Sequence, residues 1–322
     1  MSQKVVITDY TFPSLVAEEA AAASAGAAFS AHQCKTDAEV AEAVKDADAV
    51  AVQFATFGPL AAQAVRPGAT VIRYCVGYDN IDLKAAAAAD LRVGYVPDYC
   101  ADEVADHTAA SILTLLRKLV PLDASVRAGD WAAVKVCKPI KPFAETTVGF
   151  FGMGQIGSAV KARLAGFGFQ FIAADPGLSR AQAKAAGVLL VSSDTLLAQA
   201  DIISLHAPGT PQTTGFFNAK RLAQMQPHAM IVNSARGLLI NENDLAAALE
   251  NGTIAGAALD VFQTEPLPAT SPLRGAPNCL LTPHAAWYSE AAIGRLQGLV
   301  ADDLTAALSG RGPRKPVPVL KG

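Results

Sequence analysis

The chain has 322 residues, which is long enough for two domains that each bury a core. Hydrophobic residues make up 51% of it and charged residues 17%, a balance typical of a globular enzyme that excludes extensive disorder. The 26 basic residues nearly match the 29 acidic ones. Without a basic excess to bind phosphate backbones, nucleic acid is not an expected partner.

The five cysteines are scattered, and no two of them form a C-x-x-C pair. They predict neither a disulfide framework nor a metal site, so a cytoplasmic protein is expected. The first residues lead directly into a strand-like run at 5–8 and lack the layout of a signal peptide. No window approaches the ~18 apolar residues of a membrane helix, so no membrane partner is expected.

Short β-rich runs alternate with helical patterns in the first third of the chain. Strands are predicted at 4–8, 48–53, 70–75 and 92–96, and helices at positions such as 36–46, 57–65 and 82–90. Alternation of this kind is typical of parallel strands joined by crossover helices.

A long helix is predicted to follow, with Asp102 as its N-cap. Its apolar face is formed at helical spacing by Val104, Thr108, Ile112, Leu115 and Leu119. The stretch from about 121 to 146 is predicted to be less regular.

The alternation then restarts. Strands are predicted at 147–152, 170–174, 201–205, 229–233, 255–259 and 279–282. A last helix is predicted at 289–308, before an irregular tail with Pro313, Pro316 and Pro318. The chain therefore predicts two α/β blocks with a cleft between them, where open α/β proteins commonly bind ligands.

Only the second block carries a glycine-rich turn between a strand and a helix. Gly152 permits the tight turn, Gly154 lets the backbone approach a pyrophosphate, and Gly157 lets helix and strand pack closely. The next strand ends at Asp175, where a carboxylate would bind ribose hydroxyls and repel a 2′-phosphate. NAD is therefore the expected cofactor, although Arg180 lies nearby and weakens the preference over NADP.

Four polar residues follow predicted strands of the same block, where open sheets bind ligands: Arg236, Asp260, Glu265 and His284. Histidine titrates near neutral pH, and a neighbouring carboxylate favours the imidazolium. Arginine can bind a substrate carboxylate through two N–H bonds. Together Arg236, Glu265 and His284 fit the interconversion of a small 2-hydroxy acid and its 2-keto acid, with His284 transferring the proton.

The ordered set of motifs resembles the D-isomer-specific 2-hydroxyacid dehydrogenase family. The motifs are residues 76–82 (VGYDNID), 103–108 (EVADHT), the turn at 152–157, 233–237 (NSARG), 258–266 (ALDVFQTEP) and 281–284 (LTPH). The resemblance implies two doubly wound parallel-sheet domains. A Rossmann NAD domain would span 101–287, and a flavodoxin-like substrate domain would combine 1–100 with 288–322.

The resemblance also implies site residues and a homodimer joined through the NAD domains. Arg236, Glu265 and His284 match the catalytic positions, and Val76 and Gly77 match the substrate-carboxylate loop. The implied dinucleotide contacts are Thr108, Gly152, Gly154, Gln155, Ile156, Gly157, Asp175, His206, Ala207, Pro208, Thr213, Ser234, Ala235, Arg236, Asp260 and His284.

The residues after His284 depart from the glycine-containing segment of many members. The run Ala285-Ala286-Trp287 is similar to the C-terminal-binding-protein branch, in which the tryptophan lines the substrate pocket and an arginine matching Arg73 binds substrate. Trp287 could instead pack between domains. Two alternatives stay open: a phosphoglycerate or hydroxypyruvate/glyoxylate enzyme of the same family, and a non-catalytic, NAD-sensing corepressor-like protein.

Overall fold

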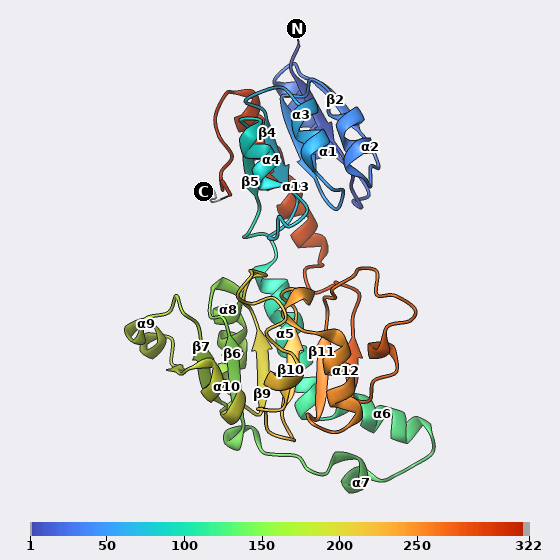
Figure 1. Ribbon diagram of the computed structural model, residues 1–322, viewed down its shortest axis with the longest axis vertical. Helices are drawn as coiled ribbons and strands as arrows, with labels where there is room; N and C mark the ends of the chain where they lie inside the picture. The colour runs from blue at the N-terminus through green and yellow to red at the C-terminus, as the bar shows by residue number, and fades with distance from the viewer. Residues whose placement is uncertain (1, 318–322) are drawn as a thin grey trace. The chain divides into compact units, whose positions relative to one another are not determined.

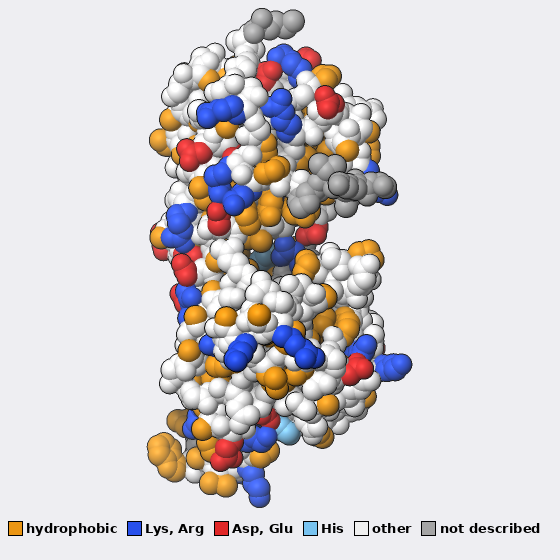
Figure 2. All heavy atoms as spheres, turned by 90° about the vertical axis from the view of Figure 1, so that its left-hand side faces the viewer, with side chains coloured by type: hydrophobic (Ala, Val, Ile, Leu, Met, Phe, Trp, Pro, Cys, Tyr) orange, Lys and Arg blue, Asp and Glu red, His pale blue; other side chains and the backbone are white. Residues whose placement is uncertain are grey.

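The computed structural model describes residues 2–317 and divides the chain into two compact units, each built on one parallel sheet (Figure 1). Unit 1 comprises Met1–Cys100 and Ser289–Gly322, and unit 2 comprises Ala101–Tyr288. Within the described part of the chain, no helix combines the length and hydropathy needed to span a membrane. On the face shown in Figure 2, basic and acidic side chains lie interspersed.

Unit 1 has a five-stranded sheet in the order β2-β1-β3-β4-β5, the flavodoxin-like order. Its strands are β1 (Lys4–Ile7), β2 (Ala28–Ala31), β3 (Ala49–Val52), β4 (Thr70–Arg73) and β5 (Arg92–Tyr95). Its helices are α1 (Val16–Ser24), α2 (Asp37–Ala43), α3 (Pro59–Ala64), α4 (Leu83–Ala88) and α13 (Glu290–Leu308). Ser289 caps α13 by accepting a hydrogen bond from the Ala292 N–H.

Unit 2 has a seven-stranded sheet in the order β12-β11-β10-β9-β6-β7-β8. The chain crosses over between β8 and β9, as in the Rossmann fold, and β12 is added at one edge. The strands are β6 (Thr147–Phe151), β7 (Gln170–Ala174), β8 (Leu189–Leu190), β9 (Ile202–Leu205), β10 (Met230–Asn233), β11 (Gly256–Leu259) and β12 (Cys279–Leu281). The helices are α5 (Ala101–Leu116), α6 (Leu119–Arg127), α7 (Ala133–Cys137), α8 (Gln155–Leu164), α9 (Arg180–Ala185), α10 (Ser193–Gln199), α11 (Ala219–Leu222) and α12 (Glu242–Glu250).

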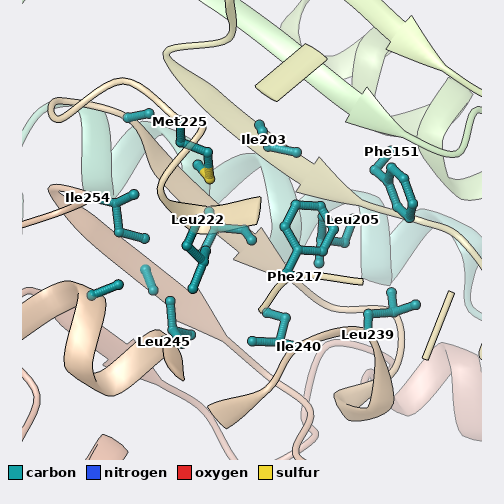
Figure 3. Close-up of a cluster of buried hydrophobic side chains, with 14 of the residues drawn as sticks. Phe151, Ile203, Leu205, Phe217, Leu222, Met225, Leu239, Ile240, Leu245 and Ile254 are labelled. Carbon is teal, nitrogen blue, oxygen red and sulfur yellow. The ribbon is translucent and has the colours of Figure 1, made fainter. Parts of the chain in front are cut away.

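Both faces of the unit 2 sheet are covered, because alternate residues of its strands enter two different hydrophobic clusters. In β9, Ile203 and Leu205 belong to the cluster of Figure 3, whereas Ile202 packs on the opposite face. In β10, Ile231 joins the first cluster and Val232 the second. Burial on both faces explains why these strands appear in the sequence as mostly apolar runs rather than as alternating apolar and polar residues.

Three expectations for the region around α5 were wrong. Asp102 is not the N-cap, because α5 already begins at Ala101 and Asp102 lies in its first turn. Leu119 belongs to α6 and not to the long helix. The helix is interrupted before it, at Lys118, whose φ of 50° lies in the left-handed region. The stretch expected to be irregular contains α6, α7 and a short 3-10 turn at Phe143–Glu145.

The edge strands β2 and β8 were not predicted from the sequence. β2 has the sequence AFSA, with one large apolar residue, and β8 has only two residues, so neither presents an apolar run long enough to be recognised as a strand. The tail after α13 is irregular up to Val317, as expected, apart from a single β-bridge between Gly94 and Pro316. Tyr95 N donates to Lys315 O (3.1 Å) and Val317 N donates to Val93 O (2.9 Å), so the tail covers the free edge of β5. Pro318 lies outside the described residues.

Candidate active site

Three neighbouring strands of unit 2 end at the same edge of the sheet. Asn233 in β10 pairs with Leu259 in β11, and Leu259 pairs with Leu281 in β12. All three strands are parallel, so the segments that follow them leave the sheet side by side. These segments carry Arg236, Glu265 and His284.

His284 and Glu265 form a direct pair. The imidazole Nδ1 lies 2.7 Å from Glu265 Oε2, and the two side chains are 38% and 35% exposed. Glu265 is fixed by a second bond, since its Oε1 accepts the Phe262 N–H at 2.9 Å. Partial burial acts to raise the pKa of Glu265, but the bonds from His284 and Phe262 outweigh it and the pKa is lowered. The pair therefore favours a charged carboxylate next to the imidazole.

The loop that carries Arg236 is fixed by the buried side chain of Asn233. Its Nδ2 donates to Arg236 O (2.9 Å), and its Oδ1 accepts the Ala235 N–H (3.0 Å). Gly237 packs so closely on the next segment that a Cβ there would lie 2.0 Å from the carbonyl carbon of Phe262. This contact ties the Arg236 loop to the segment of Glu265, and the charge of Arg236 helps to lower the pKa of that carboxylate.

The glycine-rich turn after β6 has the geometry of a dinucleotide site. Gly152 has a φ of 92°, and a Cβ there would lie 2.8 Å from Ala207 N. A Cβ on Gly157 would lie 2.8 Å from Gly152 O, which explains the close packing of helix on strand. By contrast, a Cβ on Gly154 would meet nothing within 4 Å, so open space lies before the N-terminus of α8.

The start of α8 can receive an anion. No side chain among residues 2–317 caps the helix, whose N-cap is Gly154 and whose first residues are Gln155 and Ile156. Its first N–H groups and its dipole are thus directed at the open space. Asp175, at the end of β7, is held there by the Met153 N–H on Oδ2 and the Gly177 N–H on Oδ1, both at 2.7 Å. These residues fit a bound dinucleotide.

His206 follows β9 on the other side of the same turn. Its Nε2 lies 2.8 Å from Ser204 Oγ, its ring stacks on Phe150, and burial lowers its pKa to about 3. The histidine is therefore neutral and unsuited to donate a proton at neutral pH. Ala207 packs against Gly152, and the Pro208 carbonyl accepts from Thr213 Oγ1 at 2.6 Å.

Other predicted residues lie as follows. Ser234 and Ala235 are half-buried in the Arg236 loop. Thr108 is fully buried on α5, and its hydroxyl donates to Val104 O (2.7 Å).

Two further predicted residues flank the turn of His284. Trp287 is half-buried, with its ring 5.8 Å from that of Tyr288 in an edge-on arrangement. Asp260 is buried and holds the turn around His284 through Ala285 N and Ala286 N, both at 2.9 Å.

In unit 1, Arg73 lies at the end of β4. Its Nε donates to Asn80 Oδ1 at 2.6 Å, but its buried Nη1 has no hydrogen-bond partner among the described residues. A buried guanidinium nitrogen without an acceptor is costly unless a ligand supplies one. Val76 and Gly77 follow in a half-buried loop.

The sequence analysis missed two histidines with polar partners. His107 on α5 contacts Thr282, and His228 lies 2.5 Å from Asp201 at the opposite end of the sheet. The contact of His107 spans 175 positions and that of His228 spans 27, so the sequence indicated neither partner, although His107 lies within the motif at 103–108.

Comparison with known proteins agrees with this geometry. Residues 109–286 match the family described as D-isomer specific 2-hydroxyacid dehydrogenase, NAD binding domain. The chain is 39% identical over 269 residues to D-3-phosphoglycerate dehydrogenase of Mycobacterium leprae, a match that covers 83% of this chain and 50% of that protein. The chain spans about half the length of the curated relatives it matches.

Solved structures of similar proteins cover the whole fold. A glyoxylate reductase from Paecilomyes thermophila is 27% identical, with a TM-score of 0.87 over 99% of both chains. The NAD-complexed D-isomer specific 2-hydroxyacid dehydrogenase from Lactobacillus delbrueckii ssp. bulgaricus is 26% identical, with a TM-score of 0.77 over 98% of this chain and 100% of that one. The chain thus belongs to the D-isomer specific 2-hydroxyacid dehydrogenase family and contains its NAD-binding domain.

Proposed function

We propose that the protein is an NAD-dependent oxidoreductase that interconverts a D-2-hydroxy acid and the corresponding 2-keto acid. The observation that carries this proposal is the 2.7 Å pair of His284 and Glu265, on a sheet edge shared with Arg236. The names of relatives, which include D-3-phosphoglycerate dehydrogenase and glyoxylate reductase, agree with this class of reaction.

Each of the three residues has one chemical task in the reduction. Bound NADH supplies the hydride for the carbonyl carbon. His284 donates the proton of its Nε2 to the carbonyl oxygen, while Glu265 on Nδ1 fixes the ring and stabilises its charge. Arg236 binds the substrate carboxylate and polarises the adjacent carbonyl. In the oxidation, neutral His284 takes the hydroxyl proton.

We also propose that residues of both units serve this reaction. Unit 2 is the cofactor domain, with Gly152–Gly157 and Asp175 at the dinucleotide, and unit 1 is the substrate domain. Arg73, Val76 and Gly77 of unit 1 and Trp287 of unit 2 bind the organic acid. The unpartnered Nη1 of Arg73 supports this assignment, because an anionic substrate would supply the acceptor that it lacks.

The protein is further proposed to be a cytoplasmic homodimer. The segment of α6 and α7 exposes an unusual share of apolar side chains, led by Trp131 at 94% and Val134 at 78%. Apolar patches of this kind mark protein contacts, and the segment belongs to the NAD domain, through which the resemblance predicts dimerisation. The presence of all five cysteines as thiols agrees with a reducing compartment.

The decisive experiment measures NADH oxidation across a panel of 2-keto acids of increasing side-chain size, including phosphorylated ones. We expect the parent to turn over at least one acid, and we expect kcat with that acid to fall about 10³-fold or more in His284→Ala. His32→Ala serves as the control, since the one described hydrogen bond of the His32 side chain is to Ser30 of the same unit. Tight NADH binding without turnover of any acid would favour the NAD-sensing alternative.

The panel of acids also separates an enzyme for phosphorylated acids from one for unphosphorylated acids. A preference for 3-phosphohydroxypyruvate would support the activity named for the mycobacterial relatives. A preference for an unphosphorylated acid would support the placement of Trp287 in the substrate pocket.

A further inference from the structure

The turn that carries His284 is strained. His284 has a φ of 52°, in the left-handed region that side-chain-bearing residues rarely adopt. Such a conformation costs on the order of 1–3 kcal/mol and persists only where its surroundings hold it. The question is therefore which groups hold this turn.

One buried residue, Asp260, accepts most of the hydrogen bonds that hold this turn. Asp260 is 2% exposed; its Oδ1 accepts from the Thr282 hydroxyl (2.6 Å) and Ala285 N (2.9 Å), and its Oδ2 accepts from Ala286 N (2.9 Å). Its main-chain oxygen accepts the His284 N–H at 2.8 Å. The same residue thus binds the turn before, at and after His284.

A second histidine completes this network from another helix. His107 Nε2, on α5, lies 3.2 Å from Thr282 Oγ1 and 3.8 Å from Asp260 Oδ1. The single hydroxyl proton of Thr282 is donated to the Asp260 carboxylate. The hydroxyl oxygen must therefore accept from His107, which requires a proton on His107 Nε2.

We propose that His107 is a positioning residue for His284, acting through Thr282 and Asp260. The imidazole N–H of His107 orients the Thr282 hydroxyl toward Asp260, and Asp260 holds the left-handed turn that directs the His284 ring. Small displacements of a proton donor are costly, because proton transfer requires the donor within hydrogen-bond reach of the reacting oxygen. The role of His284 as proton donor rests on the function proposed above, whereas the network itself does not.

The test uses paired variants that remove or keep one hydrogen bond. His107→Leu removes the donor, whereas the amide nitrogen of His107→Gln reproduces Nε2. Thr282→Val removes the hydroxyl at nearly constant shape, and Thr282→Ser keeps it. We expect kcat to fall about 10-fold in His107→Leu and Thr282→Val and to recover to within about 3-fold of the parent in the other two. The dissociation constant for NADH, measured by fluorescence, changes less than about 2-fold in all four variants.

A measurement without turnover separates this inference from the proposed function. The imidazole cross-peak of His284 in a ¹H–¹³C NMR spectrum, assigned by its loss in His284→Ala, should move in His107→Leu and return in His107→Gln. His32→Leu, a histidine of unit 1, should leave it in place. The inference would be overturned if the chemical shift of His284 were unchanged in His107→Leu. It would also be overturned if kcat fell equally in His107→Leu and His107→Gln. A parent without keto-acid turnover but with the expected NMR shifts would overturn only the proposed function.

Discussion

His284 Nδ1 and Glu265 Oε2 lie 2.7 Å apart, although 19 positions separate the two residues in the chain. The lowered pKa of Glu265 keeps this carboxylate charged at neutral pH, and a charged neighbour favours the protonated imidazole. Since the proposed keto-acid reduction needs that proton, we expect the pair to set the pH range over which the reduction works.

Glu265→Gln removes the charge and keeps the size of the side chain. We expect kcat for reduction to fall about 10- to 100-fold, because the imidazolium loses its stabilising partner. The alkaline limb of the pH profile should move to lower pH, since less negative charge holds the proton on His284. Steady-state rates at pH values from 5 to 10 measure both effects. Glu250→Gln, an exposed carboxylate on α12, is the control, and an unmoved alkaline limb would contradict the assigned role.

The glycines of the dinucleotide turn should separate binding from stability. Gly154→Ala places a methyl group in open space where a phosphate is expected, so the dissociation constant for NADH should rise about 10-fold with little change in Tm. Gly157→Ala forces its Cβ to 2.8 Å from Gly152 O and should cost about 1–3 kcal/mol of stability. Fluorescence titration measures NADH binding and thermal unfolding measures stability. Equal changes in binding and in stability for the two variants would contradict the separate roles of Gly154 and Gly157.

Asp175 is expected to determine the preference for NADH over NADPH. Asp175→Ala removes the carboxylate that the Met153 and Gly177 N–H groups hold in place. Affinity for NADH should fall about 10-fold, and discrimination against NADPH should relax, because the charge that repels a 2′-phosphate is gone. The ratio of kcat/KM values for the two cofactors is the measurement. Asp194→Ala, at an exposed position on α10, is the matched control, and an unchanged ratio would refute the role of Asp175.

The exposed apolar segment predicts a specific effect on assembly. Replacement of Trp131 and Val134 by serine should convert a dimer into a monomer of 33.2 kDa, because two of the most exposed large apolar side chains of the described residues are removed. Sedimentation velocity measures the mass. Val16→Ser, which changes a 68% exposed valine of unit 1, should leave the dimer intact. A parent that is already monomeric at micromolar concentration would rule out the proposed dimer.

The far end of the unit 2 sheet predicts a contribution to acid stability. Asp201 is largely buried and accepts from Lys141 Nζ (2.7 Å), Thr147 N (2.8 Å) and His228 Nε2 (2.5 Å). Burial acts to raise its pKa, but these donors outweigh it and lower the pKa below 3.8. The stabilisation is therefore complete above the unfolded pKa of 3.8 and is lost as pH falls through that value toward the folded pKa.

Asp201→Asn should accordingly lower the free energy of unfolding by about 2 kcal/mol at pH 7 and by less near pH 3, which lies below the unfolded pKa. Urea denaturation at both pH values measures the difference. Asp194→Asn, whose ion pair with Arg221 is exposed, should change stability by less than about 1 kcal/mol. Equal losses for Asp201→Asn at pH 7 and pH 3 would show that its charge is not the cause.

The sequence by itself determined the features that local chemistry and strand order encode. Predominantly apolar runs located the central strands, because burial on both faces leaves few polar positions in them. The glycine turn at 152–157 and the polar residues after β10, β11 and β12 could be predicted as a site, because parallel strands must deliver their carboxyl ends to one edge. Strands β2 and β8 were missed because neither contains an apolar run of several residues, and helices α6 and α7 because none of their residues is buried in a core.

Only the tertiary structure decided which polar groups meet. It paired His284 with Glu265, joined His107 to Thr282 across 175 positions, and showed that burial makes His206 a neutral ring rather than a proton donor. The left-handed φ of His284 is equally invisible in the sequence, because nothing about a histidine after a proline indicates it. Such properties depend on long-range packing and on the local dielectric, which no sequence spacing encodes.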